Sequence, residues 1–78
     1  MHDPDARWSN VGAELARHDR ATDAVVPDAD RPVALAARAQ VALDAAGLSA
    51  EERAAAVEGI VEGYGFWLWE ATGAMTWE

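Results

Sequence analysis

One helix ends and another begins within residues 46–52, Ala-Gly-Leu-Ser-Ala-Glu-Glu. Gly47 stands where a left-handed residue commonly ends a helix, and Leu48 follows at the position that packs back onto the preceding turn. Ser49 and Glu52 have the spacing of a capping box, which begins a new helix. A stop and a start separated by two residues predict an αα-hairpin, and this hairpin indicates the fold class.

Helices are predicted on both sides of this junction and near the N-terminal end of the chain. Apolar residues at three-to-four spacing indicate each of them. Pro32 suits the first turn of the helix before the junction, and Pro27 and Pro32 interrupt the chain ahead of it. The predicted helices span residues 4–21, 32–46 and 50–72, and a connector spans residues 23–31.

The last predicted helix carries an apolar stripe that continues through two glycines. The stripe comprises Ala50, Ala54, Val57, Val61, Tyr64, Leu68, Ala71 and Met75. Gly63 and Gly65 each weaken a helix by up to about 1 kcal/mol relative to alanine. The high β-propensity of Phe-Trp-Leu-Trp leaves a second arrangement open, a hairpin that pairs residues 66–70 with residues 75–78. The uninterrupted stripe favours the helix, ending near Thr72.

The whole sequence fits one small helical domain over residues 1–78. It contains 19 alanines but few large apolar side chains, and alanine contributes little buried area. A core of this kind gains stability from a partner or from a second copy of the chain. We therefore expect an all-α domain of two to three helices around the αα-hairpin, with an aromatic-rich C-terminal segment, that forms a homodimer.

Negative charge is concentrated in the second half of the chain. Six arginines face 14 acidic residues, which gives a net charge of −8. Residues 1–39 carry seven acidic residues and five arginines (net −2), whereas residues 40–78 carry seven acidic residues and one arginine (net −6). Phosphate contacts need clustered lysine and arginine, so we expect no direct binding of nucleic acid. An acidic half instead suits a basic protein partner.

The sequence contains no cysteine, which excludes disulfides and thiolate metal sites. The first residues are acidic and polar, unlike those of a signal peptide. No apolar run approaches the roughly 20 residues that span a bilayer. We therefore expect a cytoplasmic protein with no membrane contact.

No residue pattern indicates catalysis, a cofactor or a metal. His2 and His18 lack the spacing of metal-ligating histidines. Asp28 and Asp30 begin like a calcium loop, but Pro32 occupies the third ligand position. The serines lack the surroundings of a nucleophile, and no phosphate-binding loop is present. We therefore expect a non-enzymatic protein without cofactors.

Two groups of side chains near the C-terminal end are candidates for partner binding. The acidic group comprises Glu51, Glu58, Glu62 and Glu70. The aromatic group comprises Phe66, Trp67, Trp69 and Trp77. Tryptophan is enriched where proteins meet, which favours an interface. The alternatives are an ordinary solvated face for the acidic group and a core position for Trp67.

These features predict a protein that acts by binding another protein. Its small size and acidity suit an inhibitor of the phage or mobile-element kind, such as an anti-CRISPR or anti-restriction factor, that occupies a basic nucleic-acid-binding surface. The alternative is an accessory or assembly subunit of a larger enzyme or particle, with the tryptophan-rich end as a permanent interface. Salt distinguishes them, because ionic strength weakens an electrostatic complex far more than a hydrophobic one.

Overall fold

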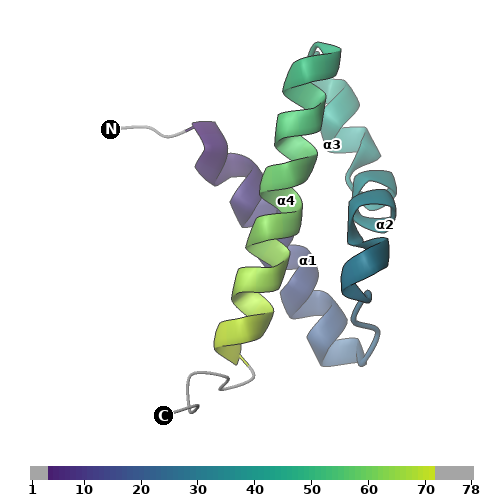
Figure 1. Ribbon diagram of the computed structural model, residues 1–78, viewed down its shortest axis with the longest axis vertical. Helices are drawn as coiled ribbons and strands as arrows, with labels where there is room; N and C mark the ends of the chain where they lie inside the picture. The colour runs from purple at the N-terminus through teal and green to yellow at the C-terminus, as the bar shows by residue number, and fades with distance from the viewer. Residues whose placement is uncertain (1–3, 72–78) are drawn as a thin grey trace.

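The computed structural model describes the backbone of residues 4–71 and the side chains of residues 6–69 (Figure 1). The elements follow in the order α1 (Pro4–Thr22), the 3-10 helix η1 (Asp28–Asp30), α2 (Arg31–Arg38), α3 (Gln40–Ala45) and α4 (Ala50–Ala71). The predicted all-α class is confirmed, with more helices than the two to three expected. No helix in the described part of the chain is long and apolar enough to cross a membrane.

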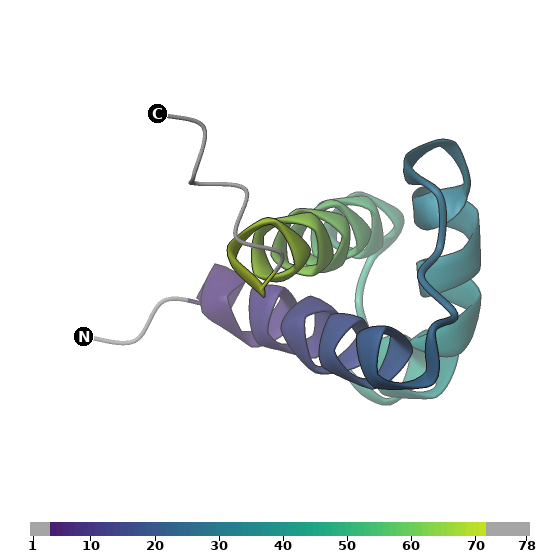
Figure 2. The same ribbon diagram turned by 90° about the horizontal axis from the view of Figure 1, so that it is seen from below.

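The helices form a crossed pair, α1 and α4, with α2 and α3 beside it. α1 and α4 cross each other and make most of the contacts between elements. α2 and α3 run in the opposite direction to α4 and stand on one side of the pair, as Figure 2 shows from below. The core therefore lies where α2 and α3 close over the crossing of α1 and α4.

The predicted helix over residues 32–46 is divided at Ala39. The backbone of Ala39 departs from ideal helical angles, at φ −95° and ψ 8°. Hydrogen bonds still cross the break, from the Ala39 N–H to Leu35 O at 2.9 Å and from the Leu43 N–H to Ala39 O at 2.9 Å. In a straight helix, residues four apart differ by about 40° in their direction around the axis, so a row of them gradually turns away from one face. The bend allows all three of these residues to remain buried.

The junction between α3 and α4 has the geometry that its sequence predicts. Gly47 is left-handed at φ 65°, and its N–H donates to the Asp44 carbonyl oxygen at 3.2 Å. The Ser49 N–H donates to a Glu52 carboxylate oxygen at 2.9 Å, and the Glu52 N–H donates to the Ser49 hydroxyl oxygen at 3.2 Å. Both halves of the capping box are therefore formed.

α4 continues as a helix through both internal glycines. Residues 66–70 are helical, so the alternative hairpin, which needs them as a strand, is wrong. The other strand of that hairpin, residues 75–78, lies outside the described residues. α4 is helical as far as Ala71, and the predicted end near Thr72 lies outside the described residues.

The core is built from one side of each helix. Its buried apolar members are Trp8, Ala16, Leu35, Ala39, Leu43, Ala56, Ile60, Tyr64 and Leu68. On α4 the buried apolar side chains recur every fourth position from Ala56 to Leu68. The predicted stripe was correct at Tyr64 and Leu68, but Ala50 and Ala54 are exposed.

Glycines allow α1 and α4 to approach with their backbones in contact. A Cβ atom on Gly12 would collide with the Ile60 carbonyl oxygen, and one on Gly63 would collide with the Ser9 carbonyl oxygen. Both glycines are buried. Two residues that lower helix propensity are therefore required by packing at the crossing.

Candidate protein-binding surface

The outward face of α4 carries a line of carboxylates, Glu51, Glu58 and Glu62, which we call the acidic ridge. All three residues are exposed. Their spacings of seven and four residues keep them within about 40° of one another around a helix axis. Ile60 and Ala56 lie on the opposite side of α4 and are buried. The core therefore fixes the direction in which the acidic ridge faces.

Two exposed aromatic side chains continue this face toward the C-terminal end of α4. Phe66 is 61% exposed and Trp69 is 47% exposed. Their rings stack on each other, with centroids 6.4 Å apart and planes 26° apart. We call them the aromatic pair. Phe66 follows Glu62 by four residues and Trp69 follows it by seven, so the aromatic pair adjoins the acidic ridge.

A groove runs between the N-terminal half of α1 and the acidic ridge. Its volume is about 410 Å³, and we call it the α1–α4 groove. Small side chains make up much of its wall, and Glu58 and Glu62 supply its negative charge. The residues that line it are Ala6, Trp8 and Ser9 of α1 and Ala55, Glu58, Gly59 and Glu62 of α4.

A second, more apolar groove lies on the other side of α4, against the beginning of α2. Its volume is about 270 Å³, and it is lined by Pro32, Ala54, Val57, Glu58 and Val61. Glu58 lines this groove as well as the α1–α4 groove. The Glu58 carboxylate therefore stands on the wall between two depressions of different polarity.

The arginines that form ion pairs in the described part of the chain are not directed at the acidic ridge. Arg31 pairs with Asp28 at 3.2 Å, Arg38 with Asp19 at 2.6 Å and Arg53 with Asp44 at 2.9 Å. Among the described residues, Glu51, Glu58 and Glu62 form no ion pair. Their charge is therefore available to a partner.

The remaining candidate residues lie elsewhere. Trp67 is half-buried and packs against the core, on the side of α4 away from the acidic ridge. Glu70 belongs to α4, but its side chain is not described. Trp77 lies outside the described residues. The structure thus brings five of the eight predicted residues onto one face: Glu51, Glu58, Glu62, Phe66 and Trp69.

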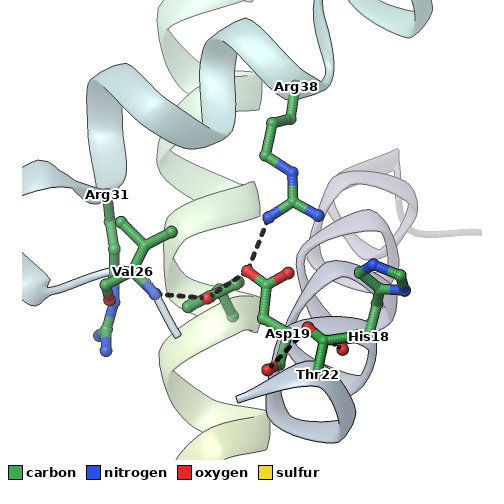
Figure 3. A network of polar contacts seen from close by, with 7 residues as sticks. His18, Asp19, Thr22, Val26, Arg31 and Arg38 are labelled. Carbon is green, nitrogen blue, oxygen red and sulfur yellow. Dashed lines mark hydrogen bonds and ion pairs between the residues drawn. The ribbon is translucent and has the colours of Figure 1, made fainter. Parts of the chain in front are cut away.

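A second cluster of ionisable groups lies where α1, α2 and α4 meet (Figure 3). Asp19 is only 2% exposed and accepts hydrogen bonds from Arg38 Nη1 and from the Tyr64 hydroxyl, both at 2.6 Å. The Tyr64 hydroxyl oxygen in turn accepts a hydrogen bond from the Val26 N–H at 2.9 Å. Arg31 donates to the Val26 carbonyl oxygen at 3.0 Å. One network therefore ties three helices to the connector.

The protonation equilibria of this network are shifted by burial and by its hydrogen bonds. Burial alone raises the pKa of Asp19, but the hydrogen bonds from Arg38 and Tyr64 and the charge of Arg38 outweigh it and hold the pKa below its usual value. Burial, followed by the hydrogen bond to Asp19, raises the pKa of Tyr64. The hydrogen bond to Asp19 raises the pKa of Arg38. Asp19 is therefore held as a carboxylate.

Buried ionisable groups with shifted pKa values are common in active sites, but here the cluster is explained by packing. Neither groove described above includes Asp19, Arg38 or Tyr64 in its wall. No buried side-chain polar atom in the described residues lacks a hydrogen-bond partner. Nor do those residues hold a cluster of three or more potential metal ligands. We assign the network to positioning the helices.

The sequence did not predict the contribution of α1 to the surface. Ser9 and Ala6 join Gly59 and Ala55 across the α1–α4 groove, although some 50 residues separate them in the chain. The available signal was the pair of small-residue positions on α4, Gly59 and Gly63, which the sequence places on a second face of the helix. That face is partly covered by α1 and partly open as the groove.

No model of a known protein family, no curated protein sequence and no solved structure matches this chain. The function is therefore argued from the surface itself.

Proposed function

We propose that this chain is a non-enzymatic protein that binds a positively charged surface of another protein through the outward face of α4. The observation that carries the proposal is the joining of the acidic ridge to the aromatic pair on one face, opposite the core. Carboxylates steer and orient a basic partner, and exposed aromatic rings supply the apolar contact area that holds it.

The partner surface that fits this face best is one that binds nucleic acid. Such surfaces carry clustered lysine and arginine, often with apolar or aromatic groups that stack on bases. Glu58 and Glu62 are separated by about 6 Å along the helix axis, a spacing similar to that of neighbouring phosphates along a nucleic-acid strand. Occupation of the basic surface by α4 would exclude the nucleic acid, so the proposed action is inhibition of a nucleic-acid-handling protein.

The test is capture of the partner with single charge reversals. Tagged wild-type chain, Glu58→Arg, Glu62→Arg and the control Glu14→Arg are mixed with nuclease-treated extract of the cells that encode the chain. Each substitution changes the net charge equally, and Glu14 is exposed on α1. We expect wild type and Glu14→Arg to capture a protein that Glu58→Arg and Glu62→Arg do not capture. Added nucleic acid should displace this protein.

Two results would contradict the proposal. Equal capture by all four chains would show that the acidic ridge is not the binding face. Loss in all three variants, including Glu14→Arg, would show that only the net charge matters. Circular dichroism checks that each variant keeps its helix content.

The exposed aromatic pair favours a second candidate function, that of a subunit held permanently by a larger assembly. Phe66 at 61% exposed is an unusually open position for a phenylalanine. A subunit interface of this kind keeps its affinity at high ionic strength, whereas the proposed electrostatic complex loses it. Elution of the captured protein with salt therefore separates the two functions.

A further inference from the structure

We infer that the α1–α4 groove receives an arginine side chain of the partner, whose guanidinium group lies between the carboxylates of Glu58 and Glu62. The inference rests on the proposed function and deepens it, because it names the chemical group that the partner presents. Three observations support it: the space in the groove, its charge, and the position of Phe66 one helical turn beyond Glu62.

The α1–α4 groove has room for one long side chain. Ala6, Ala55 and Gly59 leave space for an aliphatic stem, and the volume is about 410 Å³. The groove lies between two helices whose separation is fixed by the glycine contacts of Gly12 and Gly63. Because the helices cannot move closer, the depression persists without a ligand.

The charge of the groove suits a cation. Glu58 and Glu62 lie on its wall, one helical turn and about 6 Å apart along the axis of α4. Neither carboxylate is paired within the described part of the chain, whereas Asp19, Asp28 and Asp44 each have an arginine. A single cation placed between the two carboxylates relieves their mutual repulsion and gains two attractions.

The surroundings favour arginine over lysine. A guanidinium group is planar, donates hydrogen bonds on several sides and stacks on aromatic rings, whereas an ammonium group is a compact, strongly hydrated charge. Phe66 is 61% exposed and follows Glu62 by one helical turn on α4, so its ring is a neighbour of that carboxylate. Within the chain, Arg7 lies 4.6 Å from the centroid of Trp8 and Arg31 lies 5.2 Å from that of Tyr64. Stacking of guanidinium on aromatic rings is therefore already used in this fold.

The inference is tested with two peptides of equal charge, hexa-arginine and hexa-lysine, titrated into the wild-type chain by calorimetry at moderate ionic strength. We expect hexa-arginine to bind with a dissociation constant about fivefold lower than that of hexa-lysine. In NMR spectra, the amide signals of Ser9 and Gly59 shift most.

Two neighbouring alanines provide matched variants. Ala55 and Ala54 are both exposed on α4, but Ala55 lines the α1–α4 groove and Ala54 lines the apolar groove on the other side. Leucine is a good helix former at either position. We expect Ala55→Leu to fill the groove and weaken hexa-arginine binding about tenfold, with Ala54→Leu within about twofold of wild type.

Equal affinity for the two peptides, or a larger loss in Ala54→Leu than in Ala55→Leu, would overturn the inference. Its failure is distinguishable from failure of the proposed function. If partner capture still depends on Glu58 and Glu62 but Ala55→Leu and Ala54→Leu bind hexa-arginine alike, only the arginine site is wrong. If capture does not depend on those two residues, the proposed function is wrong as well.

Discussion

Asp19 shows how a charged side chain is accommodated in a core this small. Its carboxylate is 2% exposed, and transfer of an unpaired carboxylate into such a position is strongly unfavourable. The hydrogen bonds from Arg38 on α2 and Tyr64 on α4 compensate the lost solvation. These bonds have specific geometry, so they also fix how α2 and α4 are placed on α1.

The lowered pKa of Asp19 predicts a loss of stability in acid. In the unfolded chain this carboxyl titrates near pH 4, so its contribution is complete above about pH 4 and disappears as the pH falls through the lower folded value. Asp19→Asn removes the charge and is expected to lower the free energy of unfolding by about 3 kcal/mol at neutral pH. That difference from wild type, measured by urea unfolding, narrows as the pH falls below 4.

The raised pKa of Tyr64 predicts a second loss in alkali, with the opposite sign of pH dependence. Its contribution is complete below about pH 10 and is lost as the pH rises through the folded value. Tyr64→Phe is the control variant, because it retains the ring but cannot ionise. The free energy of unfolding is compared between wild type and each of the two variants across the pH range. If neither difference changes with pH, this account of the network is wrong.

At the scale of the helix, the sequence predicts features that depend on neighbouring residues better than features that depend on contacts between distant ones. Gly47, Ser49 and Glu52 act within a few residues, so their sequence alone predicts the end of one helix and the beginning of the next. The local effect of Gly63 argues against a helix, because glycine lowers helix propensity, and yet Gly63 lies within α4. Its role depends on Ser9, which is distant in the chain.

The candidate site divides in the same way. Glu58, Glu62 and Phe66 recur every four residues, so helical spacing alone brings them to one face of α4. The α1–α4 groove and the Asp19 network need side chains from α1 and α4 together, and no pattern within one helix contains that information. The bend at Ala39 is also a tertiary effect, because neither proline nor glycine occurs there.

Two glycines of α4 allow packing and propensity to be separated. Gly63→Ala places a Cβ against the Ser9 carbonyl oxygen at the crossing, so we expect it to lower the free energy of unfolding by about 1–3 kcal/mol. Gly65→Ala is the matched control, because the nearest atom to its Cβ would be Arg31 Nη1 at 3.5 Å, an ordinary contact. There the gain in helix propensity dominates, and we expect up to about 1 kcal/mol of stabilisation.

Urea unfolding followed by circular dichroism measures both changes. If the two substitutions had the same effect, α1 and α4 would not be in backbone contact at Gly63. The α1–α4 groove, whose depth depends on that contact, would then also need revision.

At the scale of the whole molecule, attraction and repulsion share one face. The aromatic pair offers exposed apolar area that a second copy of the chain would cover. Pairing of two α4 helices through this face would also bring two acidic ridges together, because Glu62 lies one turn from Phe66. The repulsion between them falls as salt screens the charges.

We therefore expect a homodimer that is weak at low ionic strength and becomes stronger as salt is added, which is the reverse of the response expected for the basic partner. Light scattering across a salt series measures it. Phe66→Ser is expected to remove the dimer, whereas Val41→Ser, which removes an 82% exposed valine from α3, leaves it intact. A dimer insensitive to Phe66→Ser would place the interface on another face. A dimer that salt dissociates would instead indicate attraction between the acidic ridge of one copy and arginines of the other, such as Arg17 and Arg20, which are exposed on α1.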